Sequence, residues 1–159
     1  MVLLKGTALV LYESGAMFRI NKLTDYAVVL LVDMARTGRV RSAQQIAADT
    51  GVPLPTVSKV MKALTRDGLV LSTRGASGGY ALGRPADGIT VADMIQAIEG
   101  PIALTSCVES ADDGCGIESL CPMHGHWNRV NGAVHAALSS VTLAEMTHDT
   151  PTFGIAAAG

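Results

Sequence analysis

The chain has 159 residues, of which 48% are hydrophobic and only 4% aromatic, and its formal net charge is −2. This length fits one domain with short appendages, whose core must be built from Ala, Val, Leu, Ile and Met. No apolar run is long enough to span a bilayer, so we expect no membrane association.

Charge is spread unevenly along the chain. From Met17 to Pro85 ten basic residues stand against four acidic ones, and ten minus four leaves +6. After Pro85 the only basic residue is Arg129, against nine acidic ones. A basic half suits a polyanion such as nucleic acid, whereas the acidic half must serve another purpose.

The two ends of the chain read as appendages. Residues 1–16 hold a short apolar run that is broken by Lys5, Gly6 and Thr7, which only faintly imitates a signal peptide. We expect residues 1–16 to be a disordered extension and the functional domain to begin at Met17. Residues 148–159 are expected to form a flexible tail.

Two helices are predicted at the start of the basic half. Residues 23–36 are apolar nearly all round, which predicts a buried helix. Ser42 and Gln45 have the spacing of a capping box, which opens a second helix ending at Thr50. Gly51 then turns the chain sharply.

A third helix separates its apolar residues from its polar and basic ones. Pro55 suits its first turn, because the missing N–H would be unpaired there, and Gly68 is expected to end it. The core face repeats apolar residues at helical spacing: Val57, Val60, Met61 and Leu64. The outer face holds Thr56, Ser58, Lys59, Lys62 and Arg66. Two helices joined by a glycine turn, the second with a basic face, are typical of a helix-turn-helix.

A β-hairpin is predicted next, from a strand-like run at 69–74, a glycine-rich turn at 75–79 and a returning run at 80–82. A hairpin after a helix-turn-helix is a wing, so residues 17–86 predict a winged helix-turn-helix domain. By itself such a hairpin is only a turn, and basic side chains are often only a solvated face. Here we expect DNA contacts: Thr56, Ser58 and Lys59 at base edges or nearby phosphates, and Lys62, Arg66 and Arg74 on phosphates.

Residues 87–104 read as a connecting segment with one helix. Thr90 and Asp93 are spaced to cap a helix from Val91 to Glu99. Gly100 and Pro101 close it.

The most specific pattern of the chain lies in residues 105–125. Its ligand-type residues are Cys107, Cys115, Cys121 and His124, which read C-x7-C-x5-C-x2-H. The polar, glycine-bearing residues between them indicate a loop, and a loop that gathers thiolates is typical of a metal or iron–sulfur site. An odd thiol number argues against a disulfide framework and fits a reducing, cytoplasmic location.

Other chemistry for these residues stays open at this point. Zinc would accept a set of three cysteines and one histidine, although the gaps are longer than in short zinc knuckles. Direct thiol redox sensing without metal is a further alternative. Cys121 and His124 could serve as nucleophile and base, but no oxyanion hole or substrate pocket is evident, so we do not expect an enzyme.

Residues 126–147 predict a long helix with an apolar stripe. The stripe consists of Trp127, Val130, Val134, Leu138 and Val141. Because it follows a complete small domain, a partner chain is a plausible place to bury it. Thr142 and Glu145 are spaced to cap a final short turn. The fold class is therefore mainly α with a small β-hairpin: a winged helix-turn-helix plus a long C-terminal dimerisation helix.

Four segments resemble one family of bacterial winged-helix regulators that sense iron–sulfur clusters, the IscR, NsrR, RirA and SUF-operon regulator type. They are the opening segment 18–28, the wing segments 68–70 and 73–80, and the cysteine segment 107–124; the likeness covers residues 17–147. The resemblance implies a homodimer on a palindromic operator in double-stranded DNA. It also implies one cluster per subunit that controls operator affinity, and repression of iron–sulfur assembly genes.

The resemblance leaves the fourth cluster ligand and the signal open. His124 matches the histidine of IscR-type [2Fe-2S] sites, and Asp25 of the partner subunit matches the aspartate of NsrR-type [4Fe-4S] sites. We favour His124, and with it [2Fe-2S], because C-x2-H keeps the ligand local. The x7 gap is like that of RirA-type iron regulators, so an iron- or nitric-oxide-responsive repressor is the alternative. Ser58 replaces the recognition-helix glutamate of IscR-like members, so the operator sequence does not carry over.

Overall fold

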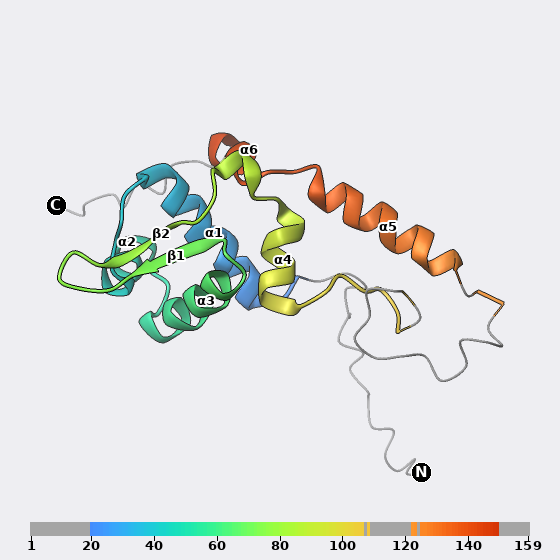
Figure 1. The fold of residues 1–159 in the computed structure, drawn as a ribbon, viewed down its shortest axis with the longest axis horizontal. Coiled ribbons are helices and arrows are strands. Elements are labelled where there is room, and N and C mark those ends of the chain that lie inside the picture. The colour runs from blue at the N-terminus through green and yellow to red at the C-terminus, as the bar shows by residue number, and fades with distance from the viewer. Residues whose placement is uncertain (1–19, 107, 109–121, 124, 150–159) are drawn as a thin grey trace, which may run out of the picture.

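The computed structural model describes residues 20–106, 108, 122–123 and 125–149. The predicted extension 1–16, most of the tail, and Cys107, Cys115, Cys121 and His124 lie outside this range. Within it the elements follow the predicted order (Figure 1): α1 (Lys22–Thr37), α2 (Ala43–Thr50), α3 (Leu54–Arg66), β1 (Val70–Thr73), β2 (Gly79–Leu82), the short 3-10 helix η1 (Ala86–Gly88), α4 (Val91–Glu99), α5 (His126–Ser139) and α6 (Leu143–Asp149).

Local capping fixes where several helices begin. The predicted box at α2 is present: the Gln45 amide donates to Ser42 Oγ at 3.2 Å, and Gln45 Oε1 accepts from the Ser42 amide at 2.8 Å. Thr90 and Asp93 form the same box at α4. At the end of α3 the prediction was one residue late, because Asp67 is the C-cap and Gly68 follows it in the left-handed region with φ 73°.

One hydrophobic core joins the helix-turn-helix to the C-terminal half. The core face predicted for α3 is fully buried. It packs against apolar side chains from α1, α2, β1, α4 and α6, which include Leu30, Leu31, Ile46, Val70, Met94 and Leu143. Aliphatic side chains dominate this core, as the low aromatic content required. Because α6 contributes to it, the end of the described chain folds back onto α1.

The wing is an antiparallel hairpin that rests on the start of α2. In its register Val70 pairs with Leu82 and Thr73 with Gly79. A Cβ at Gly79 would collide with the carbonyl of Arg41, and the φ of 157° is one that other residues rarely adopt. The glycine thus lets β2 approach the chain ahead of α2, where Tyr80 and Arg41 exchange backbone hydrogen bonds of 2.8 and 3.1 Å.

Arg41 also holds this junction through its side chain. Only 3% of the side chain is exposed, and it forms ion pairs with Asp33 on α1 and Asp49 on α2. Burial alone would lower the pKa of Arg41, but the hydrogen bonds to the two carboxylates outweigh it and raise the pKa. Arg41 therefore stays charged, and it ties α1, α2 and the wing together from one position.

We expect Asp33→Ala to destabilise the fold by about 2–3 kcal/mol, because it leaves a buried guanidinium with one partner only. Arg41→Met should cost less, since it removes the buried charge and leaves two carboxylates that water already reaches in part. Urea unfolding followed by circular dichroism measures both. Asp87→Ala, at an exposed position in η1, is the control. Equal losses for Asp33→Ala and Asp87→Ala would contradict this role of Arg41.

The C-terminal region consists of two helices and not one. α5 runs outward from the body of the molecule, and α6 lies back against it (Figure 1). The break lies at Ser140–Thr142, where the Val141 carbonyl accepts from the Val91 amide at 3.0 Å. Thr142 then caps α6 by accepting from the Glu145 amide. The amide and hydroxyl of Thr142 donate to the Glu145 carboxylate, and these two hydrogen bonds lower the pKa of Glu145. No helix in the described ranges is long and apolar enough to cross a membrane.

Candidate nucleic-acid interface and cysteine segment

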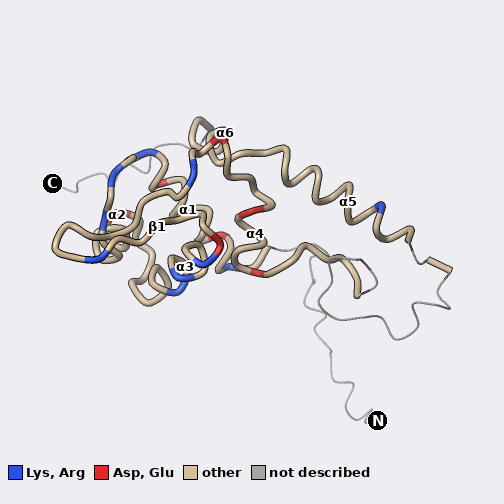
Figure 2. The backbone as a smooth tube through the Cα atoms, viewed as in Figure 1, with Lys and Arg blue, Asp and Glu red and all other residues tan. Residues whose placement is uncertain are grey.

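The outer face of α3 carries the predicted DNA contacts on one exposed surface. The spacing of three and four residues places Ser58, Lys59 and Lys62 beside one another, and all three are exposed, whereas Thr56 is half-buried near the first turn. The opposite face is buried in the core. Figure 2 shows Lys and Arg positions on α3 and on the hairpin, with the wing on the same side of the molecule as the helix-turn-helix.

Three of the predicted phosphate contacts have no acidic partner in the described part of the chain. Lys59, Lys62 and Arg74 are exposed and form no ion pair there. Arg74 directly follows β1, where the hairpin turns. A Cβ at Gly78 in this turn would fall 2.8 Å from the Arg74 carbonyl carbon, so the tight turn requires glycine. These cations are therefore available to an external anion.

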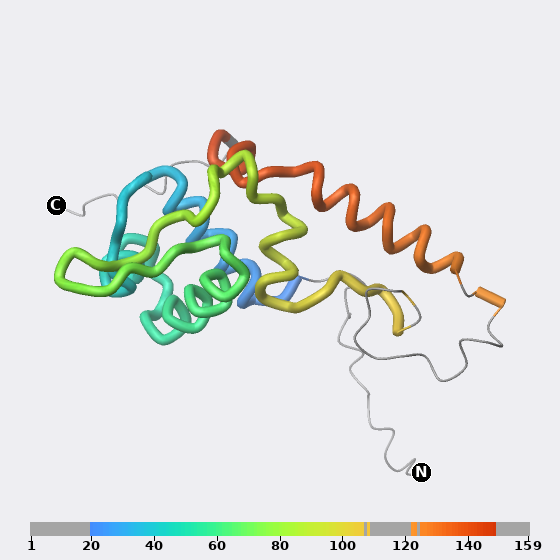
Figure 3. The backbone as a smooth tube through the Cα atoms, in the orientation of Figure 1, coloured from blue at the N-terminus to red at the C-terminus, as the bar shows by residue number. Residues whose placement is uncertain are grey.

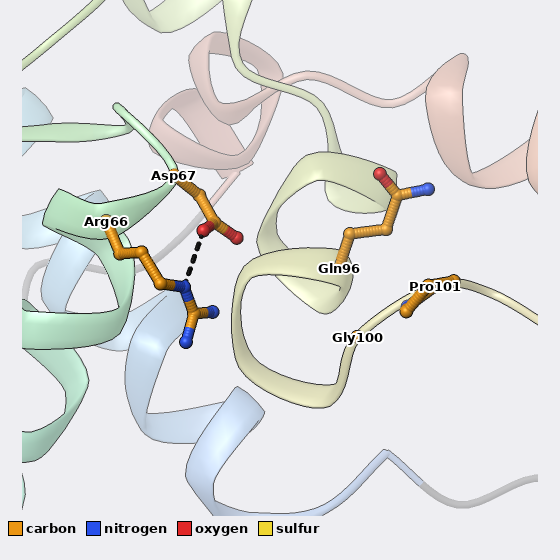
Figure 4. Close-up of a pocket in the computed structure, with 5 residues that line it drawn as sticks. All are labelled: Arg66, Asp67, Gln96, Gly100 and Pro101. Carbon is orange, nitrogen blue, oxygen red and sulfur yellow. Dashed lines mark hydrogen bonds and ion pairs between the residues drawn. The ribbon is translucent and has the colours of Figure 1, made fainter. Parts of the chain in front are cut away.

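Arg66 differs from the other predicted contacts, because its guanidinium is bonded within the chain. Nε donates to Asp67 Oδ1 at 2.8 Å, and Nη2 donates to the Ala97 carbonyl of α4, also at 2.8 Å. Figure 4 shows Arg66 and Asp67 on one side of a small open pocket and Gln96, Gly100 and Pro101 on the other. Arg66 thus links the end of α3 to the end of α4.

The end of α4 is also tied to α1. Glu99 Oε1 accepts from the hydroxyl of Thr24 at 2.5 Å and from the amide of Asn21 at 3.2 Å. Asp25, the alternative cluster ligand, is the next residue in this first turn and its side chain is exposed. Asp25 is therefore open to a group outside its own subunit.

The cysteine segment joins the end of α4 to the start of α5 (Figure 3). Its described flanks are held together by Asn131 of α5, which bonds the backbone of Ile102 and Leu104. The four predicted ligands lie outside the described residues. Among the residues that are described, no three His, Cys, Asp or Glu side chains gather as a metal ion would require.

Sequence reasoning missed three side chains that organise these surfaces. Arg41 had been counted in the basic half, yet it is buried. Glu99 and Asn131 carried no motif at all. Each acts through contacts with distant parts of the chain, so no local pattern could have singled them out; the polar Asn131 within an apolar stripe was the one available hint.

Comparison with known proteins finds relatives along most of this chain. The model of the Rrf2 family, described as an iron-dependent transcriptional regulator, matches residues 20–149. IscR of Erwinia tasmaniensis is 32% identical over 127 residues, which cover 78% of this chain and 75% of that protein. Protein aau3 of Rhizobium meliloti is 31% identical over 134 residues, with 84% and 87% covered.

Solved structures agree in fold. CymR of B. subtilis, the global cysteine regulator, aligns with a TM-score of 0.62 at 30% identity, covering 84% of this chain and 99% of that one. IscR of T. potens aligns with a TM-score of 0.58 at 30% identity, covering 83% and 88%. The mainly helical architecture with a two-stranded wing is thus that of winged-helix regulators.

Proposed function

This chain belongs to the Rrf2 family of transcriptional regulators, and we propose that it binds a palindromic operator as a homodimer under the control of an iron–sulfur cluster. Its IscR and CymR relatives are regulators and not enzymes, in agreement with the sequence prediction. The observation that carries the proposal is a helix face on which Lys59 and Lys62 form no ion pair within the described residues, beside a glycine-rich wing and in one chain with the C-x7-C-x5-C-x2-H segment. Residues 17–86 would bind DNA, residues 105–125 the cluster and residues 126–147 the partner subunit.

The DNA-binding part of the proposal follows from shape and charge. An α-helix fits the major groove of B-DNA, and α3 offers Thr56, Ser58 and Lys59 near its exposed N-terminal turns. Lys62 and Arg74 would neutralise phosphates on either side. Arg66 would add least, because Asp67 and the Ala97 carbonyl already occupy its guanidinium.

Lys59→Ala is expected to weaken operator binding about tenfold at low salt and to lower the slope of log K against log salt by about 1, since one phosphate contact is lost. Fluorescence anisotropy over a salt titration measures both quantities. Asp87→Ala changes an exposed charge in η1, away from α3, and is the matched control. An unchanged affinity and slope for Lys59→Ala would remove this residue from the interface.

The cluster part rests on the chemistry of the donors. Cysteine thiols lose their protons on binding iron, and the resulting thiolates bind it strongly. Three cysteines leave one position for a weaker ligand. We propose His124 for that position and a [2Fe-2S] cluster; Asp25 of the partner subunit with a [4Fe-4S] cluster is the alternative. When bound, the group would supply a charge and a covalent cross-link between its ligands. Its loss would change the conformation of the flanks of the segment, Ile102–Leu104 and α5.

We further propose that the protein represses genes for iron–sulfur cluster assembly. The alternative within the family is a repressor that responds to iron or nitric oxide. The test is anaerobic purification with visible and Mössbauer spectra, followed by gel shifts on the protein's own promoter with and without cluster. A brown protein whose operator affinity depends on the cluster supports the proposal. A colourless protein with one zinc per chain would instead make the cysteine segment a structural zinc site.

A further inference from the structure

We propose that Asn131 is a positioning residue that closes the base of the cysteine segment and so prepares it for its ligand. This inference rests on the proposed cluster-binding function. Asn131 lies in the second turn of α5, five residues after His126, where the chain has just left the segment. Its partners, Ile102 and Leu104, lie where the chain is about to enter it.

Two hydrogen bonds of Asn131 to described residues use both ends of its amide. Nδ2 donates to the Ile102 carbonyl at 2.8 Å, and Oδ1 accepts from the Leu104 amide at 3.0 Å. The side chain thus satisfies a carbonyl and an N–H of the chain just ahead of the segment, two backbone groups that need hydrogen-bond partners. Among the twenty amino acids only Asn and Gln carry a neutral donor and acceptor in this arrangement, and Asn is short enough for a close approach.

Burial singles out this position on its helix. Asn131 is only 8% exposed, and it is the one buried residue among those described for α5. Its neighbour Val130 is 45% exposed although it is apolar. Asn131 is polar and buried, whereas the apolar Val130 beside it is exposed. Hydrogen bonds, and not the hydrophobic effect, therefore explain why Asn131 is buried.

The contact between Asn131 and Leu104 brackets the predicted ligands in the sequence. The clamp spans 27 positions, from Leu104 to Asn131, and all three cysteines and His124 fall inside that span. Holding the two ends together removes most of the entropy that ligands would otherwise lose on converging. Residues that orient ligands without touching the metal commonly change metal affinity 10–100-fold, which sets the scale of the expected effect.

The inference is tested on the full chain, reconstituted anaerobically with iron and sulfide. We expect Asn131→Ala to shorten the lifetime of the visible absorption under a chelator challenge about tenfold. Asn131→Asp keeps the acceptor for Leu104 but loses the donor for Ile102, and should fall between Ala and the parent. His135→Ala, which removes a polar contact of α5 with Gln96 of α4, is the matched control and should leave the lifetime unchanged.

A second measurement separates positioning from a general loss of structure. In the cluster-free protein, Asn131→Ala should accelerate exchange of the Leu104 amide while helix content and thermal midpoint stay those of His135→Ala. A cluster lifetime equal to the parent's would overturn the inference, as would a loss of helix content that matches the loss of cluster. A parent protein that takes up no iron would overturn the proposed function itself, whatever the exchange of Leu104 shows.

Discussion

Replacing Cys107, Cys115 and Cys121 together by alanine is expected to abolish iron binding and to make operator affinity independent of iron and redox state. The thiolates are the soft ligands of the proposed site, and no other cysteine exists in the chain to replace them. Coupling between two sites is typically worth 5–150-fold in affinity. The parent should show a ratio in that range between loaded and cluster-free protein, and the triple variant a ratio of 1. Iron content and anaerobic gel shifts measure the two effects.

The triple variant should still bind DNA as well as the cluster-free parent does. The described core that supports α3 and the wing draws on α1, α2, α3, β1, α4 and α6, and none of these elements contains a cysteine. Met123 is exposed and precedes His124 in the sequence. Met123→Ala is the matched control, and this variant should keep both iron binding and regulation. If the triple variant bound and released its promoter under every condition as the parent does, cluster control would be refuted.

The fold was largely predictable because its signals are local. The capping-box spacings at Ser42 and Thr90 predict where two helices begin, and both boxes are present in the structure. The apolar residues of α3 at helical spacing define a face that is fully buried. The glycines of the hairpin mark a turn that side chains would obstruct. Such features depend on a few neighbouring residues, so the sequence alone determines them.

Long-range polar contacts were not predictable in the same way. A count of charges places Arg41 and Arg66 in the basic half on equal terms with Lys59. Packing separates them: Arg41 is buried between two carboxylates, Arg66 reaches the Ala97 carbonyl, and Lys59 stays exposed. Which charged group meets which carboxylate depends on how helices far apart in sequence come together, and no periodicity encodes that.

The two halves of the candidate site differ for a related reason. Residues on α3 are positioned by a helix, so their shared face follows from spacing. The cysteines and His124 lie outside the described residues, so the ligand assignment, including the choice between His124 and Asp25, stays a prediction from donor chemistry. The contacts at its flanks, Asn131 with Ile102 and Leu104, add a physical constraint that the motif itself did not contain.

Val130→Glu is expected to convert the proposed dimer to a monomer and to weaken operator binding on the order of 100-fold or more. Val130 is 45% exposed on α5, which runs outward from the body (Figure 1), and Val141, just beyond the end of this helix, is 41% exposed. Apolar side chains in a row on an outlying helix are suited to pack against a second copy. A carboxylate there would be desolvated in each subunit of a dimer, at high cost, whereas a monomer leaves it in water.

Loss of the dimer affects DNA binding because two linked recognition helices gain 10²–10⁴-fold over one. Light scattering gives the mass, and anisotropy on a full and a half operator gives the affinity. Ala136→Glu is the matched control, because it adds the same charge at an exposed position more than 100° around α5 from Val130. Since Val130 is already exposed in the single chain, its variant should keep the helix content of Ala136→Glu. A dimeric Val130→Glu protein with full operator affinity would show that α5 is not the interface.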